Sequence, residues 1–174
     1  MKILNRIFFT LTIVWMIVIF ILSAQTGDDS ANLSGGITKA IISFIYRDFD
    51  SFSPDKQLSI LDTAHFVIRK LAHFTEYVIL GIFSSLTFIT NICANQSKFN
   101  SKSFRNHMFR TMLFSYVFST LYAVTDEIHQ GFTDNRYPSI KDVLIDSSGA
   151  LFGVIIACII FYYFHIKKVI KANS

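Results

Sequence analysis

The sequence has few charged residues, few prolines and few cysteines, and each shortage excludes a class of protein. Charged residues make up 16% of the 174 positions, whereas a soluble domain carries about a quarter. The two cysteines, Cys93 and Cys158, both lie in apolar runs, which excludes a disulfide-stabilised scaffold. Two prolines and seven glycines exclude a collagen-like chain. Hydrophobic residues reach 52%, which excludes a disordered chain and is typical of an integral membrane protein.

Four apolar stretches are candidates for membrane-spanning helices, at about residues 7–24, 73–94, 108–127 and 143–164. A helix of about 18 residues rises by about 27 Å, close to the thickness of the hydrocarbon core of a bilayer. The third stretch contains only 15 consecutive uncharged residues and must extend into its polar flanks. Because unbroken apolar runs favour helices over strands in lipid, the sequence predicts an all-α, polytopic membrane protein that forms one domain over residues 1–174.

The charges are distributed unevenly among the connections between these stretches. Nine lysines and arginines lie before the first stretch, between the second and third, and after the fourth, with no acid beside them. All 12 acids lie in the other two connections or at the helix ends that border them. The positive-inside rule therefore places both termini in the cytoplasm of a multi-pass protein of the cell membrane. The basic pI of about 9.1 then reflects anchoring cations and not a nucleic-acid-binding face.

Two features of the N-terminal third have alternative interpretations. The first stretch could be a cleaved signal peptide, although Leu22 fits the cleavage pattern poorly. In the outer connection that follows, apolar residues recur at helical spacing over residues 37–45, with Thr38, Lys39 and Arg47 on the opposite side. This pattern predicts a short amphipathic helix on the outer bilayer surface, which could cover the bundle or close over a substrate. Ser53 and Pro54 predict the start of a further helix that leads into the second span.

Polar and small residues form a stripe on the second, third and fourth spans, where each reaches the outer surface. Ionisable residues rarely face lipid, and small residues let membrane helices approach closely. We therefore expect the three stripes to face one another and to gather their charged ends, with Arg136, near the outer interface. The residues of the stripes recur at steps of three and four or lie alongside: Lys70, His73, Glu76, Tyr77 and Gly81; Asp126, Glu127 and Gln130; Asp142, Asp146, Gly149 and Gly153.

Several of these residues have a purely structural alternative. Lys70 could anchor a helix end, and His73 with Glu76 could be a hydrogen-bonded structural pair. Asp142 could form a capping box with Ser139. The adjacent carboxylates Asp126 and Glu127 have no such simple explanation, because they repel each other unless a cation, a metal or a proton is shared.

The same residues resemble the VanZ-like membrane proteins. The resemblance rests on the order and spacing of several short motifs, which together cover most of residues 20–157: Ser23-x-Gln25 with Ser30 and Ser34, Lys70-x-x-His73-x-x-Glu76-Tyr77 with Gly81, Asp126-Glu127-x-x-Gln130, Arg136, Asp142-Val143-x-x-Asp146 and Gly149-x-x-x-Gly153. Asp146 stands where asparagine is frequent in the family, which puts a neutral amide role at this position in doubt. The family is named after a protein associated with resistance to the lipoglycopeptide teicoplanin, and the resemblance implies a bacterial cell-envelope protein.

Three functions are open at this point. The first is binding or alteration of a cell-envelope amphiphile, such as a lipid-linked cell-wall precursor or a lipoglycopeptide. Lys70 and Arg136 would bind its anionic head group with help from helix N-termini. The remaining stripe residues would contribute as further ligand contacts, namely Tyr77, Gln130, Asp142 and Asp146, or by close packing, namely Gly81, Gly149 and Gly153.

The second function is a membrane-embedded hydrolase or transferase. His73 would act as general base oriented by Glu76, and Asp126 or Glu127 would act as acid. No cofactor is firmly implied, but a divalent metal held by His73 and carboxylates is an open variant, with oxygen-rich ligation favouring Mg²⁺ or Mn²⁺. The third function is a small ion-coupled transporter, for which a homo-oligomer could supply a wider pathway.

Overall fold

The computed structural model describes the backbone of residues 1–24, 27–95, 101–133 and 138–173. Within these ranges it describes all side chains except those of residues 27–34, 37, 94–95, 101–103 and 165–173. Every regular element in the described part of the chain is helical: α1 (Lys2–Ser23), α2 (Gly27–Ile45), the short 3-10 helix η1 (Phe49–Ser51), α3 (Pro54–Asn95), α4 (Ser101–Gln130) and α5 (Ile140–Asn173). The all-helical character predicted from the apolar runs is therefore confirmed.

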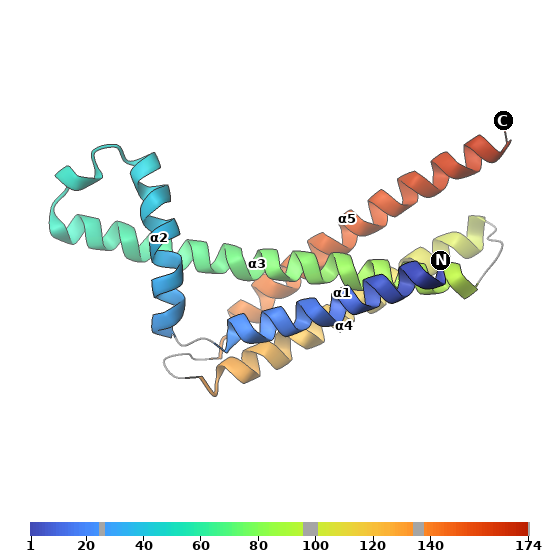
Figure 1. The fold of residues 1–174 in the computed structure, drawn as a ribbon, viewed down its shortest axis with the longest axis horizontal. Coiled ribbons are helices and arrows are strands. Elements are labelled where there is room, and N and C mark those ends of the chain that lie inside the picture. Colours follow the sequence, from blue (N-terminus) through green and yellow to red (C-terminus); the bar gives the residue numbers. More distant parts are fainter. Residues whose placement is uncertain (25–26, 96–100, 134–137, 174) are drawn as a thin grey trace.

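The four long helices alternate in direction and form one elongated bundle (Figure 1). α1 and α4 lie along α3, and α5 crosses α3 at an angle before it extends away from the other helices (Figure 1). α3 and α5 form the most extensive contact between helices. The beginning of α1 and the end of α5 lie at the same end of the molecule, opposite α2 (Figure 1).

Three helical segments among the described residues are long and apolar enough to cross a membrane: Lys2–Ser23, Pro54–Cys93 and Ile140–Phe164. They contain the first, second and fourth predicted stretches and support a membrane environment. The third predicted stretch lies within α4, which is less apolar because Arg105 and Arg110 lie near its start and Asp126 and Glu127 near its end. The predicted number of four spans therefore stays a prediction.

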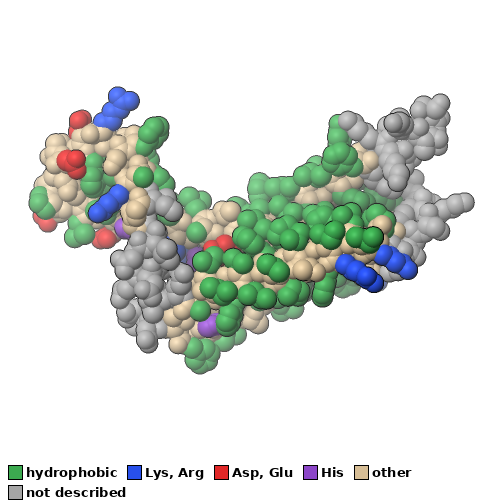
Figure 2. Space-filling view, in the orientation of Figure 1, with side chains coloured by type: hydrophobic (Ala, Val, Ile, Leu, Met, Phe, Trp, Pro, Cys, Tyr) green, Lys and Arg blue, Asp and Glu red, His purple; other side chains and the backbone are tan. Residues whose placement is uncertain are grey.

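The surface of the bundle agrees with a membrane environment. On the face shown in Figure 2, hydrophobic side chains cover the middle of the molecule, and charged side chains gather toward its ends. α1 alone leaves Phe9, Ile17 and Ile21 more than half exposed. Such a continuous apolar surface is costly in water and favourable in lipid.

The segment after α1 differs in one way from its prediction. The predicted helix at residues 37–45 begins earlier, at Gly27, whereas the predicted helix start at Pro54 is confirmed, and this helix leads into the second span without a break and continues to Asn95. At about 1.5 Å per residue, the 42 residues of α3 extend over about 63 Å, so part of this helix projects beyond the bundle (Figure 1). α2 lies across that projecting part.

The contact between α2 and α3 uses a face of α2 that its sequence suggests to be polar. Thr38 and Ile42 are buried, and the Thr38 hydroxyl lies 3.2 Å from Nδ1 of His65 on α3. Phe44 and Ile45 are 87% and 64% exposed, which leaves an apolar face of α2 free to lie on a bilayer. Ile37, which belongs to the predicted apolar face, has a side chain outside the described set.

Glycines allow α3 and α5 to approach each other closely. A Cβ atom added to Gly149 would collide with the backbone carbonyl of Phe74, and one added to Gly153 would collide with that of Val78. From the other side, Gly81 lies against the backbone of Ala150. Van der Waals packing of this kind is a main source of helix association in membranes. It also fixes the register of the two helices just below the polar residues of both.

Candidate functional site

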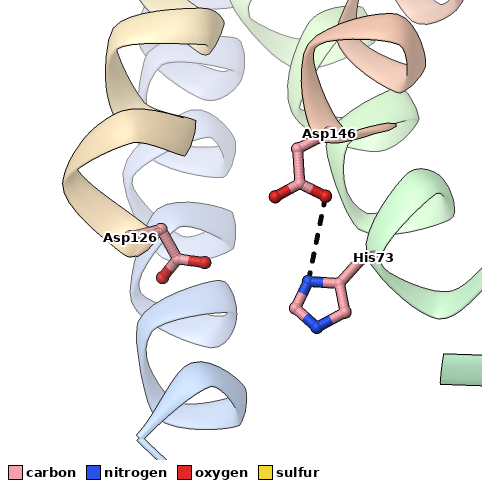
Figure 3. Close-up of side chains that lie close together, drawn as sticks. All are labelled: His73, Asp126 and Asp146. Carbon is pink, nitrogen blue, oxygen red and sulfur yellow. Dashed lines mark ion pairs between the residues drawn. The ribbon is translucent and has the colours of Figure 1, made fainter. Parts of the chain in front are cut away.

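Three buried or partly buried polar side chains from different helices meet at one point of the bundle. His73 comes from α3, Asp126 from α4 and Asp146 from α5, and Figure 3 shows the three side chains directed toward a common centre. One ligand atom from each residue lies within 4.8 Å of those of the other two. We call these residues the buried triad. All three had been singled out from the sequence, but on separate helices whose mutual register the sequence did not give.

Asp146 is the most deeply buried member of the buried triad. Its side chain is 1% exposed, and its Oδ1 atom lies 3.8 Å from Nδ1 of His73 (Figure 3). The sequence suggested Glu76 as the carboxylate beside His73, and this pairing stays a prediction; the structure places Asp146, from another helix, beside the ring. The backbone carbonyl of Glu76 accepts a hydrogen bond of 2.8 Å from Nε1 of Trp15 on α1.

Asp126 is held from its own helix and lies beside two other helices. Nε2 of Gln130, one turn further along α4, donates a 3.1 Å hydrogen bond to Oδ2 of Asp126. Tyr77, which is fully buried, lies close to Asp126 and Asp146, and Ser23 at the end of α1 lies beside Asp126. The sequence motifs placed Gln130 and Tyr77 near the site and included Ser23, whereas the contribution of Trp15 carries no periodic signal and was missed.

Glu127 points away from the buried triad, although it is adjacent to Asp126. Its Oε1 atom accepts a 2.6 Å hydrogen bond from the backbone N–H of Ser139, which directly precedes α5. A carboxylate at a helix N-terminus satisfies an otherwise unpaired donor and interacts favourably with the helix dipole. The two adjacent carboxylates therefore avoid each other by facing different partners, and Glu127 has a structural task at the start of α5.

Lys70 and Asp142 form an ion pair between α3 and α5, about one turn from the buried triad. Both side chains are partly buried, at 18% and 22% exposure. The capping-box alternative for Asp142 is not what the structure shows, because Glu127 accepts the Ser139 N–H and Asp142 accepts from Lys70. Lys70 is thus paired with Asp142 within the protein.

Negative charge is in excess at this end of the bundle. Asp126, Glu127 and Asp142 all lie close enough to Asp146 to repel its charge, while Lys70 balances one of these carboxylates. Buried like charges are stable only when a proton, a cation or a hydrogen-bond donor compensates them. The arrangement is therefore suited to accept a proton or to bind a cation. Arg136, the second predicted anion-binding residue, lies outside the described residues.

An apolar pocket lies between α1 and α4, and its residue Tyr122 is one turn from Asp126 along α4. It has a volume of about 260 Å³ and is lined by Ile13, Met16, Ile17, Phe20 and Tyr122. Tyr122 precedes Asp126 by one turn on the same face of α4, and its hydroxyl donates a 2.6 Å hydrogen bond to the carbonyl of Met16. The pocket extends along α1 from Phe20 to Ile13. A molecule with a polar head and an apolar tail could place its head near the polar residues and its tail in the pocket.

Comparison with known proteins identifies one family. The family model described as VanZ/LLP1 matches residues 8–162, which is most of the chain and includes every described residue of the site. This match confirms the resemblance found in the short motifs. The chain has no significant match among curated proteins or solved structures.

Proposed function

The chain belongs to the VanZ/LLP1 family, and from this membership and the polar site we propose that it is a four-span membrane protein that binds the head group of a cell-envelope amphiphile. The amphiphile would be a lipid-linked cell-wall precursor or a lipoglycopeptide such as teicoplanin. The observation that carries the proposal is the contact between two environments: the polar side chains around Asp126 and the apolar pocket that begins one turn below at Tyr122.

The orientation of the site follows from the charge distribution. With the cation-rich segments in the cytoplasm, the end of the bundle that carries both termini faces inward (Figure 1). The buried triad and α2 lie toward the opposite end and would face the outside of the cell membrane. Lipid-linked cell-wall precursors and lipoglycopeptides are both accessible from that side.

The pocket gives the amphiphile a defined direction. Its lining is almost entirely apolar, so an acyl or prenyl chain would lie along α1 and α4 and be held there by van der Waals packing. The head group would then lie beside Asp126 and the buried triad. A phosphate or carboxylate there needs positive charge, which Lys70 could supply by exchanging its ion pair with Asp142.

An enzyme is the second candidate, and the 3.8 Å contact between His73 and Asp146 favours it. A carboxylate beside one imidazole nitrogen orients the ring and stabilises its protonated form, so the other nitrogen can take a proton from water or from a hydroxyl group. This chemistry would suit hydrolysis or transfer at the head group. The ion-coupled transporter has less support, since the carboxylates Asp126 and Asp146 lie within two turns of the end of α4 and the start of α5 and not at the middle of these helices.

A binding experiment with two matched tryptophan variants tests the proposal. The purified protein in nanodiscs is titrated with a fluorescent polyprenyl phosphate and, separately, with teicoplanin. Ile17→Trp fills the pocket, whereas Val14→Trp adds the same side chain on an exposed part of α1 that does not line it. We expect Ile17→Trp to weaken binding of at least one probe by about tenfold or more, and Val14→Trp to leave it unchanged. Equal affinity for both variants, or no binding of either probe by wild type, would overturn the proposal.

A further inference from the structure

We propose that the buried triad, His73, Asp126 and Asp146, binds one divalent cation of the Mn²⁺ or Mg²⁺ class. Binding of the ion does not depend on an amphiphile. The role suggested for it below, as the contact for an anionic head group, rests on the proposed function.

The spacing of the three residues fits a metal ion with little rearrangement. Metal–ligand bonds of about 2.1 Å place two ligand atoms at most about 4.2 Å apart. The His73 Nδ1 and Asp146 Oδ1 atoms, at 3.8 Å, already lie within that limit. The three ligand atoms lie within 4.8 Å of one another, so rotation of the Asp126 side chain alone could complete the set. Because the ligands come from three helices, the packing of the bundle holds them in place.

Asp146 provides an independent reason to expect a ligand. It is almost completely buried, and neither of its carboxylate oxygens accepts a hydrogen bond from any residue that the structure describes. Figure 3 shows its carboxylate directed toward His73 and Asp126. A buried carboxylate without hydrogen-bond donors is costly, because it has lost its hydration, and the His73 ring at 3.8 Å compensates that loss only in part. A cation at the centre of the buried triad would compensate Asp146 and Asp126 together.

The chemistry of the donor set selects the class of metal. One imidazole nitrogen and two carboxylates form an oxygen-rich site, which suits Mn²⁺ and Mg²⁺ better than the histidine- and cysteine-rich sets typical of Zn²⁺. Three protein ligands would leave positions of an octahedral ion for water or for an anion. The ion would thereby convert an acidic cluster into a site that attracts phosphate or carboxylate.

Mn²⁺ titration of the purified, EDTA-treated protein tests this inference by electron paramagnetic resonance. We expect wild type to bind one Mn²⁺ with a spin-echo modulation from a directly bound imidazole nitrogen. His73→Gln should lose that modulation, and Asp146→Asn should weaken Mn²⁺ binding by at least about tenfold. Asp142→Asn is the matched control, since it removes the same charge from the same helix one turn away, and it should bind Mn²⁺ nearly as wild type does.

Thermal unfolding separates a metal ligand from a structural ion pair. Without metal, Asp146→Asn should unfold at the same temperature as wild type or higher, because it relieves an uncompensated buried charge; Mn²⁺ should stabilise wild type alone. A lower unfolding temperature of Asp146→Asn in EDTA, without any effect of Mn²⁺ on wild type, would assign Asp146 a structural role and overturn the inference. If Asp146→Asn does not fold, the nitrogen modulation in wild type and its loss in His73→Gln decide the question.

The metal experiment contains no amphiphile, so it can fail separately from the proposed function. Binding of Mn²⁺ without binding of polyprenyl phosphate or teicoplanin would leave the metal site standing and remove the function. Binding of a probe by a protein that binds no Mn²⁺ would leave the proposed function standing and remove the metal site. Preference for Zn²⁺ with no competition from Mg²⁺ would overturn the assigned class of metal.

Discussion

Two polar regions lie about one turn apart on the same helices, yet they differ in how their charges are satisfied. Lys70 and Asp142 compensate each other across α3 and α5, and Glu127 nearby accepts the N–H at the start of α5. The buried triad has two carboxylates and one imidazole, and Asp146 accepts no hydrogen bond from the described residues. The first region is complete without a ligand. The second requires a proton or a cation, which is the property expected of a site that does chemistry or binds ligands.

The largest effect should come from breaking the helix contact that both regions share. Gly149→Leu would force a side chain into the backbone of Phe74 and should destabilise the bundle by about 3 kcal/mol or more. Thermal unfolding in detergent measures the loss. Gly36→Leu is the control, because nothing lies near the Cβ position of Gly36. An unchanged unfolding temperature for Gly149→Leu would mean that α3 and α5 do not pack as described.

The next effect separates the two regions by function. His73→Ala should reduce amphiphile binding by about tenfold or more while the protein still inserts and folds, because the buried triad is incomplete. Glu127→Gln should reduce binding by less, since the amide oxygen can still accept the Ser139 N–H. Probe titration in nanodiscs gives both values. The reverse order of the two effects would make Glu127, and not the buried triad, the functional group.

A smaller effect is expected from the ion pair. Single and double replacement of Lys70 and Asp142 by Met and Asn should give a coupling free energy of about 1 kcal/mol, as is usual for a partly exposed pair. Steric trapping in bicelles measures the free energies of unfolding that this double-mutant cycle requires. A coupling near zero would indicate that Lys70 is available for a ligand in the absence of one.

The helices and the positions of their polar stripes could be predicted from the sequence because both depend on local periodicity. The steps from Lys70 to Gly81 and from Asp142 to Gly153 place each stripe on one helical face whatever the neighbours are. The same local pattern predicted the helix start at Pro54 and, through short motifs, the family.

The pairing between helices could not be predicted, because it depends on their register and on which donors remain available. Nothing in the spacing of His73 and Glu76 indicates that Asp146 will lie beside the imidazole. In the same way, Ser139 and Asp142 satisfy a capping-box pattern, but Glu127 from another helix takes the Ser139 N–H first. α2 gives another example. The sequence places Thr38 on the polar side of this helix, yet the residue is buried, and its hydroxyl contacts His65 of α3.

The most direct test of the central claim compares Asp126→Asn with Asp142→Asn in one assay. Both variants neutralise a carboxylate at the same end of the bundle, but only the first lies in the buried triad and one turn from the pocket. Binding of polyprenyl phosphate and of teicoplanin is measured in nanodiscs with Mn²⁺ present. We expect Asp126→Asn to lose binding of the probe that wild type binds and Asp142→Asn to keep at least about a third of the wild-type affinity. Equal losses in both variants would contradict the claim that the buried triad is the functional centre.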